Sequence, residues 1–154
     1  TPGIRYLIFQ ACERSGVVPS VPLVHPSASV SPSAALGPGA TVNRLVGIGA
    51  NTRVRDFVTL NRNCSIGHDS EIDQFATIGP GAVLTGNVKV GRGAFVGAGA
   101  VLLPGISVGD NSTVGAGSAV RTDVAPFSVV AGNPASVLRE ESHGYGGYLV
   151  PTDG

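Results

Sequence analysis

Residues 61–72 hold the side chains best suited to acid–base chemistry. This segment reads Asn-Arg-Asn-Cys-Ser-Ile-Gly-His-Asp-Ser-Glu-Ile, and His68 is followed directly by Asp69. A histidine side chain can take or release a proton near neutral pH, and a neighbouring carboxylate can hold it in one tautomer. We therefore interpret His68 as a candidate general base with Asp69 as its partner. The competing interpretation is an ordinary pair of solvent-facing polar residues.

A strict six-residue repeat must position this pair. Aliphatic residues occupy every sixth position from residue 24 to residue 120 without an insertion. These positions are Val24, Val30, Leu36, Val42, Ile48, Val54, Leu60, Ile66, Ile72, Ile78, Leu84, Val90, Val96, Leu102, Val108, Val114 and Val120. A period of six does not match a helix of 3.6 residues per turn, whereas it fits a short strand followed by a turn.

A second column of small or β-branched residues lies two positions before the first, and it includes Ala40, Cys64, Ala76 and Ala94. Residues two apart on a strand share a face, so both columns point inward. Three units per coil then give an all-β fold, a parallel β-helix of about five coils over residues 24–125. We expect the glycines that follow many of the aliphatic residues to supply backbone freedom at the corners.

Coils of eighteen residues place Gly86 directly above His68. A glycine there leaves room beside the imidazole and exposes a backbone N–H that could stabilise an oxyanion. The same residue also fits a plain corner turn, because the sequence Thr85-Gly86-Asn87 has turn chemistry.

The two ends of the chain depart from the repeat. In residues 1–23, apolar residues spaced as in a helix over 4–14 and a stop at Gly16 predict a helix and a linker. Residues 126–141 are expected to form a C-terminal cap, with a short helix over 135–141 after Pro134. The Gly-rich segment 142–154 is expected to be a flexible tail.

Composition argues against several classes of function. The formal net charge is zero, so neither a nucleic-acid nor a membrane surface is indicated. No membrane-spanning run or signal segment is recognisable, and the cytoplasm is the expected location. Two cysteines at positions 12 and 64 form no disulfide framework. His68 is the one histidine inside the repeat, and His25 and His143 are read as non-catalytic. A zinc hydratase, which needs several histidines on adjacent faces, is the weakest hypothesis, and no metal is expected.

Several motifs resemble one known family. They are Ile66-Gly67-His68-Asp69 with Asn61 upstream, Gly79-Pro80-Gly81, Leu84-Thr85-Gly86-Asn87-Val88, Val114-Gly115-Ala116-Gly117 and Gly132-Asn133-Pro134-Ala135. Over residues 25–139 the chain is similar to the hexapeptide-repeat acyltransferases, in the branch of sialic-acid O-acetyltransferases and bacterial nucleotide-amino-sugar N-acetyltransferases. The resemblance implies a left-handed coil, a homotrimer with sites between subunits, and acetyl-CoA as co-substrate.

The resemblance also implies roles for individual residues. His68 would be the general base and Asp69 would tune it, while Asn61 would help to hold the acceptor. Gly86, which the coil spacing places beside His68, is the second candidate for substrate binding. Thr77, Ala98, Ala116 and Arg139 would contact acetyl-CoA, with Ala98 and Ala116 stacked on successive coils as a smooth strip. A covalent enzyme intermediate is not expected, because Cys64 belongs to an inward column.

Some features depart from the family pattern. Thr77 stands where the branch usually has a histidine, and Ser136 stands where a lysine is common after Asn-Pro-Ala. Relatives carry an N-terminal nucleotide-binding domain, of which residues 1–23 would be a remnant, so either the chain is shortened or it uses another acceptor. The leading hypothesis is acetylation of the amine of a nucleotide-linked amino-sugar. The alternatives are a sialic-acid-type O-acetyltransferase and a non-enzymatic trimeric scaffold.

Overall fold

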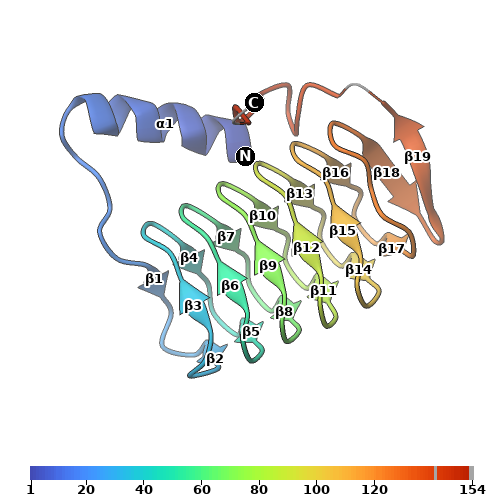
Figure 1. Ribbon diagram of the computed structural model, residues 1–154, viewed down its shortest axis with the longest axis horizontal. Helices are drawn as coiled ribbons and strands as arrows, with labels where there is room; N and C mark the ends of the chain where they lie inside the picture. The colour runs from blue at the N-terminus through green and yellow to red at the C-terminus, as the bar shows by residue number, and fades with distance from the viewer. Residues whose placement is uncertain (141, 153–154) are drawn as a thin grey trace.

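The computed structural model describes residues 1–140 and 142–152, which form a parallel β-solenoid preceded by a helix (Figure 1). Helix α1 spans Pro2–Arg14 and begins two residues before the predicted start, with the Thr1 hydroxyl accepting from the Ile4 N–H. Gly16 follows it with a φ of +73°, in the left-handed region that ends helices. The predicted N-terminal helix is therefore confirmed.

Seventeen two-residue strands make up the repeat. They are β1 (Leu23–Val24), β2 (Ser29–Val30), β3 (Ala35–Leu36), β4 (Thr41–Val42), β5 (Gly47–Ile48), β6 (Arg53–Val54), β7 (Thr59–Leu60), β8 (Ser65–Ile66), β9 (Glu71–Ile72), β10 (Thr77–Ile78), β11 (Val83–Leu84), β12 (Lys89–Val90), β13 (Phe95–Val96), β14 (Val101–Leu102), β15 (Ser107–Val108), β16 (Thr113–Val114) and β17 (Ala119–Val120). Two longer strands, β18 (Val129–Gly132) and β19 (Ala135–Arg139), follow them.

The strands form three sheets, one on each face of a triangular prism. Sheet A has the order β1-β4-β7-β10-β13-β16-β18-β19, sheet B is β17-β14-β11-β8-β5-β2, and sheet C is β15-β12-β9-β6-β3. Parallel partners lie eighteen residues apart, as in the pairing of Ile66 with Leu84. We call the turns between sheets the A/B corner (such as 61–63 and 97–99), the B/C corner (such as 49–51, 67–69 and 85–87) and the C/A corner (such as 55–57 and 73–75).

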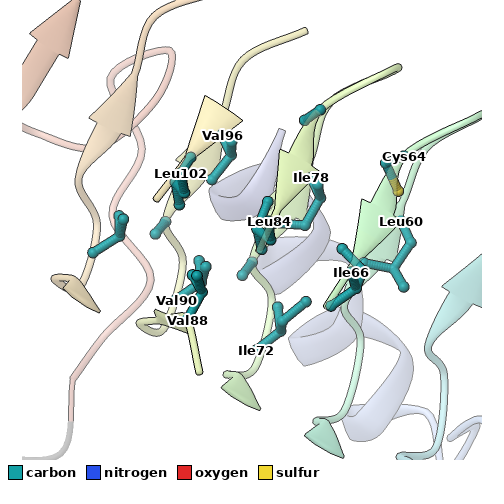
Figure 2. Close-up of a cluster of buried hydrophobic side chains, with 14 of the residues drawn as sticks. Leu60, Cys64, Ile66, Ile72, Ile78, Leu84, Val88, Val90, Val96 and Leu102 are labelled. Atoms are coloured by element: carbon teal, nitrogen blue, oxygen red, sulfur yellow. The ribbon is translucent and has the colours of Figure 1, made fainter. Parts of the chain in front are cut away.

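Both predicted inward columns fill the core (Figure 2). Leu60, Ile66 and Ile72 belong to three successive faces, and each is at most 2 % exposed. Val24 is 42 % exposed because it lies in the first coil, with no further coil of the described chain below it. The hexad pattern thus marks both the strands and the buried surface.

The glycines after the aliphatic residues serve a different purpose from the one expected. Left-handed backbone occurs three positions after the aliphatic residue, as at Asp69, whose φ is +55°. Gly67 instead allows a close approach between coils, since a Cβ there would stand 2.4 Å from the carbonyl carbon of Thr85. The demand at this position is steric rather than conformational.

The C-terminal helix predicted over 135–141 is wrong as far as residue 140, and Glu141 lies outside the described residues. Ala135–Arg139 is strand β19, paired antiparallel with β18. Strand β18 continues sheet A beside β16, so the solenoid passes the expected boundary at 125 and reaches about six turns rather than five. A strand satisfies the open edge of β18, whereas a short helix there would leave most of its own backbone groups unpaired.

The tail was expected to be flexible, but the structure packs residues 142–152 against the C/A corner and sheet A. Val150 is fully buried, and its backbone N–H and carbonyl both pair with the Asn111 amide, at 2.8 Å each. Tyr145 stacks on Phe95 with ring centroids 3.6 Å apart. The high glycine content of this segment led us to expect flexibility, although Tyr145 and Val150 within it make these contacts.

Candidate functional site

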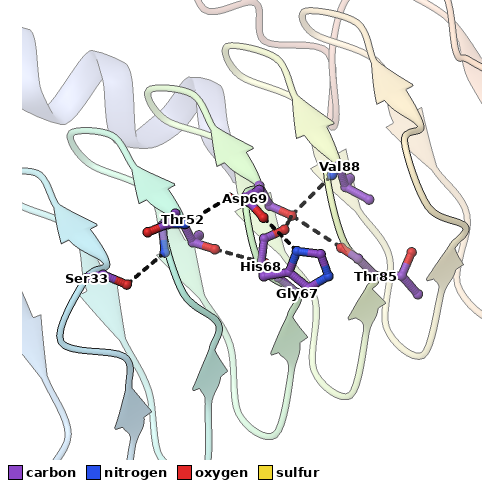
Figure 3. Close-up of polar contacts among 9 residues, drawn as sticks. Ser33, Thr52, Gly67, His68, Asp69, Thr85 and Val88 are labelled. Atoms are coloured by element: carbon purple, nitrogen blue, oxygen red, sulfur yellow. Dashed lines mark hydrogen bonds and ion pairs between the residues drawn. The ribbon is translucent and has the colours of Figure 1, made fainter.

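His68 and Asp69 lie on the B/C corner that follows β8 (Figure 3). His68 Nδ1 is 2.7 Å from Asp69 Oδ2, and the two side chains are 63 % and 45 % exposed. With Nδ1 engaged, Nε2 is the ring nitrogen left for a substrate. The structure therefore supports the predicted pairing of a base with a carboxylate at an open surface.

A third residue joins this pair from the coil below. The Asn51 side-chain amide donates from Nδ2 to Asp69 Oδ1 over 3.0 Å. The hydrogen bonds from His68, and secondarily from Asn51, hold the pKa of the Asp69 carboxyl below its ordinary value. Our reading of the sequence missed Asn51, although its spacing of eighteen residues from Asp69 was a signal that could have found it.

Gly86 lies where the eighteen-residue coil predicted, beside the His68 ring. A Cβ built on Gly86 would stand 2.6 Å from His68 Nε2 and 2.7 Å from Cε1. Within residues 1–140 and 142–152, the Gly86 N–H has no hydrogen-bond partner, while its carbonyl accepts from Gly105 N at 3.0 Å. The imidazole thus occupies the room that the missing side chain leaves.

Asn61, Ala98 and Ala116 lie on the same A/B corner, across sheet B from His68, with Asn61 about two coils before Ala98. Ala98 and Ala116 are exposed on successive coils, as predicted for a smooth strip, and Ala98 O accepts from Gly117 N at 2.8 Å. Asn61 is half-buried and donates through Nδ2 to the Ile78 carbonyl. One chain alone therefore does not bring these residues to the histidine.

Thr77 lies on sheet A beneath helix α1, away from His68. It is 6 % exposed, and its hydroxyl accepts from Arg5 Nη1 at 2.8 Å. Arg5 also donates to the backbone carbonyls of Phe57, Phe75 and Ala76. Burial lowers the pKa of Arg5 to about 10, so the guanidinium stays charged at neutral pH. The structure thus places Thr77 in the contact between the helix and the solenoid.

Arg139 also lies apart from the alanine strip. It ends β19 opposite Val129, at the start of β18, whereas Ala116 follows the end of the neighbouring strand β16. Arg139 therefore lies on the C/A side of sheet A, whereas Ala116 lies on its A/B side. The pocket beside Arg139 is lined by the tail, including His143, Gly144 and Gly146.

Other chemistry is weakly represented in the described residues. Cys64 is buried in the core, and burial raises the pKa of its thiol to about 12. No group of three or more His, Cys, Asp or Glu side chains that could hold a metal ion occurs in the described part of the chain. Helix α1, the helix found in that part, is too short to cross a membrane.

Comparison with known proteins assigns a class to this fold and site. The family model "Bacterial transferase hexapeptide (six repeats)" matches residues 69–103 and 87–122. PerB from Caulobacter crescentus, solved with CoA and GDP-perosamine, is 33% identical with a TM-score of 0.85, over 89% of this chain and 67% of PerB. The acetyltransferase domain of PglB from Neisseria gonorrhoeae, solved with acetyl coenzyme A, is 35% identical with a TM-score of 0.84, over 90% of this chain and 68% of that one.

WeeI from Acinetobacter baumannii is also similar, with 25% identity and a TM-score of 0.85 over 89% of this chain and 66% of WeeI. The chain spans about two thirds of the length of these structures. No curated protein sequence matches.

The six-residue repeat and the three-sided solenoid define the class of hexapeptide-repeat transferases. The chain belongs to the bacterial hexapeptide-repeat transferases, in the branch that contains these sugar acetyltransferases. The left-handed coil, which parallel pairing alone does not determine, is confirmed with this membership.

Proposed function

We propose that this protein transfers the acetyl group of acetyl-CoA to the amine of a nucleotide-linked amino-sugar. The observation that carries this proposal is the exposed His68, which has Nδ1 on Asp69 and Nε2 beside Gly86. The relatives add the substrates, since PerB was solved with CoA and GDP-perosamine. The cytoplasm stays our prediction for its location.

In the proposed reaction, the acceptor amine attacks the thioester carbonyl while His68 Nε2 takes its proton. The new C–N bond forms, the C–S bond breaks, and the proton passes to the departing CoA thiolate. The charge that develops on the imidazole is stabilised by the Asp69 carboxylate at 2.7 Å. The Gly86 N–H, which has no hydrogen-bond partner among the described residues, is our candidate donor to the carbonyl oxygen.

We further propose a homotrimer in which sheet B faces the threefold axis. Helix α1 and the tail cover much of sheet A, as shown by buried Thr77 and by Tyr145 on Phe95. Sheet C carries Arg53 and Lys89 outward. The outward residues of sheet B are uncharged and small or aliphatic, namely Ser29, Gly47, Ser65, Val83, Val101 and Ala119. A surface of small, uncharged residues suits contact with identical neighbours.

This arrangement would complete the site between protomers. When three prisms each turn one face to a common axis, the B/C corner of one protomer meets the A/B corner of the next. His68 would then face Asn61, Ala98 and Ala116 of its neighbour. We assign Asn61 to the acceptor and the alanine strip to the pantetheine arm. Thr77 receives no such role because α1 covers it. Arg139 receives none because it lies on the C/A side of sheet A, away from the A/B corner.

Binding and turnover test the activity. Calorimetry should detect acetyl-CoA binding, and free thiol should be released on addition of amino-sugar nucleotides but not of the matching hydroxy-sugars. His68→Ala should lower kcat by about 10²–10⁴-fold while acetyl-CoA still binds. Absence of acetyl-CoA binding would refute the transferase proposal, and turnover with sialic acid instead would move the acceptor to a hydroxyl.

Complementation tests the shared site. His68→Ala and Asn61→Ala protomers should each be impaired, but trimers assembled from a mixture should regain activity. In the mixture, an Asn61→Ala protomer contributes its intact His68 to a neighbour that has an intact Asn61. If both residues act within one chain, mixing restores nothing, and light scattering would separate this result from a failure to form trimers.

A further inference from the structure

Asn51 and Asp69 occupy equivalent positions on successive coils of the B/C corner. Asn51 Nδ2 donates to Asp69 Oδ1 at 3.0 Å, and Asp69 Oδ2 lies 2.7 Å from His68 Nδ1. Each carboxylate oxygen is thereby held by a different partner. The backbone of Asn51 is fixed in turn, because its N–H donates to Ser33 Oγ at 3.0 Å.

We propose that Asn51 is a positioning residue for acetyl transfer, which orients the Asp69 carboxylate so that His68 keeps its proton on Nδ1 and presents a bare Nε2 to the acceptor. This inference rests on the proposed function. A carboxylate free to rotate would bind the imidazole in several geometries, and a fixed one favours a single tautomer. Asn51 itself need not touch either substrate.

Apart from the contact between the His68 ring and Gly86, this corner is too open for packing to fix the Asp69 carboxylate. The His68 and Asp69 side chains are 63 % and 45 % exposed, so the orientation of the carboxylate depends on its hydrogen bonds. The pKa of Asp69 is lowered by the bond from His68 and then by the bond from Asn51, as expected for hydrogen bonds made to the charged carboxylate.

The corner conformation does not by itself require the Asn51 amide bond. Asn51 has a φ of +57°, which asparagine adopts readily, and Asn63 and Asn87 have the same conformation at φ +59°. Within the described residues, the side chains of Asn63 and Asn87 form no hydrogen bond, whereas that of Asn51 does. The turn can therefore form without the hydrogen bond from Asn51 to Asp69.

Two substitutions isolate this amide. Asn51→Gly keeps a left-handed corner and removes the donor, and Asn51→Asp keeps the shape but replaces the donor with a second carboxylate. Asn87→Gly is the matched control, since it makes the same exchange in the same corner column. The readout is ¹⁵N NMR of the His68 imidazole in the free protein, assigned by comparison with His68→Ala, together with kcat and KM for acetyl-CoA.

The wild type and Asn87→Gly should show one tautomer with the proton on Nδ1. Asn51→Gly should show a mixture of tautomers and about a tenfold lower kcat with KM for acetyl-CoA unchanged, and Asn51→Asp should lose at least as much. An unchanged tautomer in Asn51→Gly, alongside a changed one in Asp69→Asn, would overturn the proposal. The NMR measurement does not require turnover. A failed transferase assay would therefore refute the proposed function, while the NMR spectrum would still test the role of Asn51.

Discussion

The imidazole of His68 lies against Gly86 of the next coil, with Nε2 2.6 Å from the point where a Cβ on Gly86 would stand. Real Cβ atoms do not approach other heavy atoms so closely, so any side chain at this position must displace the ring. The orientation of the candidate base thus depends on a residue eighteen positions away that contributes no side chain.

Gly86→Ala should lower kcat by roughly 10–100-fold, because a displacement of about 1 Å of a reacting group has costs of that order. The φ of Gly86 lies outside the left-handed region, so alanine fits the backbone and the melting temperature should change little. Steady-state kinetics and thermal melts of the variant check both statements. Full activity in a folded Gly86→Ala protein would show that the ring position is not critical.

Asp69→Asn should lower thermal stability in a pH-dependent way. The pKa of Asp69 is lower in the folded protein than in the unfolded chain, so its stabilising effect is complete above the unfolded value of about 3.9. That effect is lost as the pH falls through the folded value. Melts from pH 3 to 8 should therefore show a gap between wild type and variant that closes at the acidic end. A gap that widens there would contradict the assigned direction.

Arg5→Leu should destabilise the docking of α1 by about 2–4 kcal/mol, since buried carbonyls of Phe75 and Ala76 lose their charged donor. Arg14→Leu, at the exposed end of the same helix, is the control and should cost about 0.5 kcal/mol or less. Urea unfolding measures the difference, and hydrogen exchange should rise in residues 2–14 of the Arg5 variant. Equal effects of the two substitutions would rule out the anchoring role of Arg5.

The two cysteines should react very differently with a thiol reagent at pH 8. Cys64 is 1 % exposed and burial raises its pKa to about 12, whereas Cys12 is partly exposed on α1. One equivalent should label the folded protein, at Cys12 by peptide mass spectrometry, and the second should react after denaturation. Rapid labelling of Cys64 in the native protein would mean that the core opens far more than its packing indicates.

The hexad predicted most of the fold because the same spacing encodes both strand and burial. Ile66 and Cys64 lie two residues apart and both are buried. The equivalent pairs from residue 40 to residue 120 are buried as well. The spacing of eighteen also placed Gly86 beside His68 correctly. The end of the chain was harder, because β19 depends on an open sheet edge that local sequence does not reveal.

The candidate site could be predicted only in part. His68 and Asp69 are neighbours in the sequence, and their bond followed from that alone. Thr77 was assigned by resemblance, but Arg5, seventy-two residues away, occupies its hydroxyl. Asn61 and His68 lie seven residues apart and yet on different corners, because one corner and one strand separate them.

The solenoid has two periods, because its core repeats every six residues while contacts between coils join residues about eighteen apart. Insertion of six residues preserves both inward columns, so the core survives, but it turns everything beyond it by one face. Six residues added between positions 69 and 80 would replace Gly86 with Pro80 beside His68. The fold tolerates changes of length in steps of six, whereas the contacts of Asn51 with Asp69 and of His68 with Gly86 tolerate no insertion between the two partners. The candidate site therefore restricts the length of the chain more tightly than the fold does.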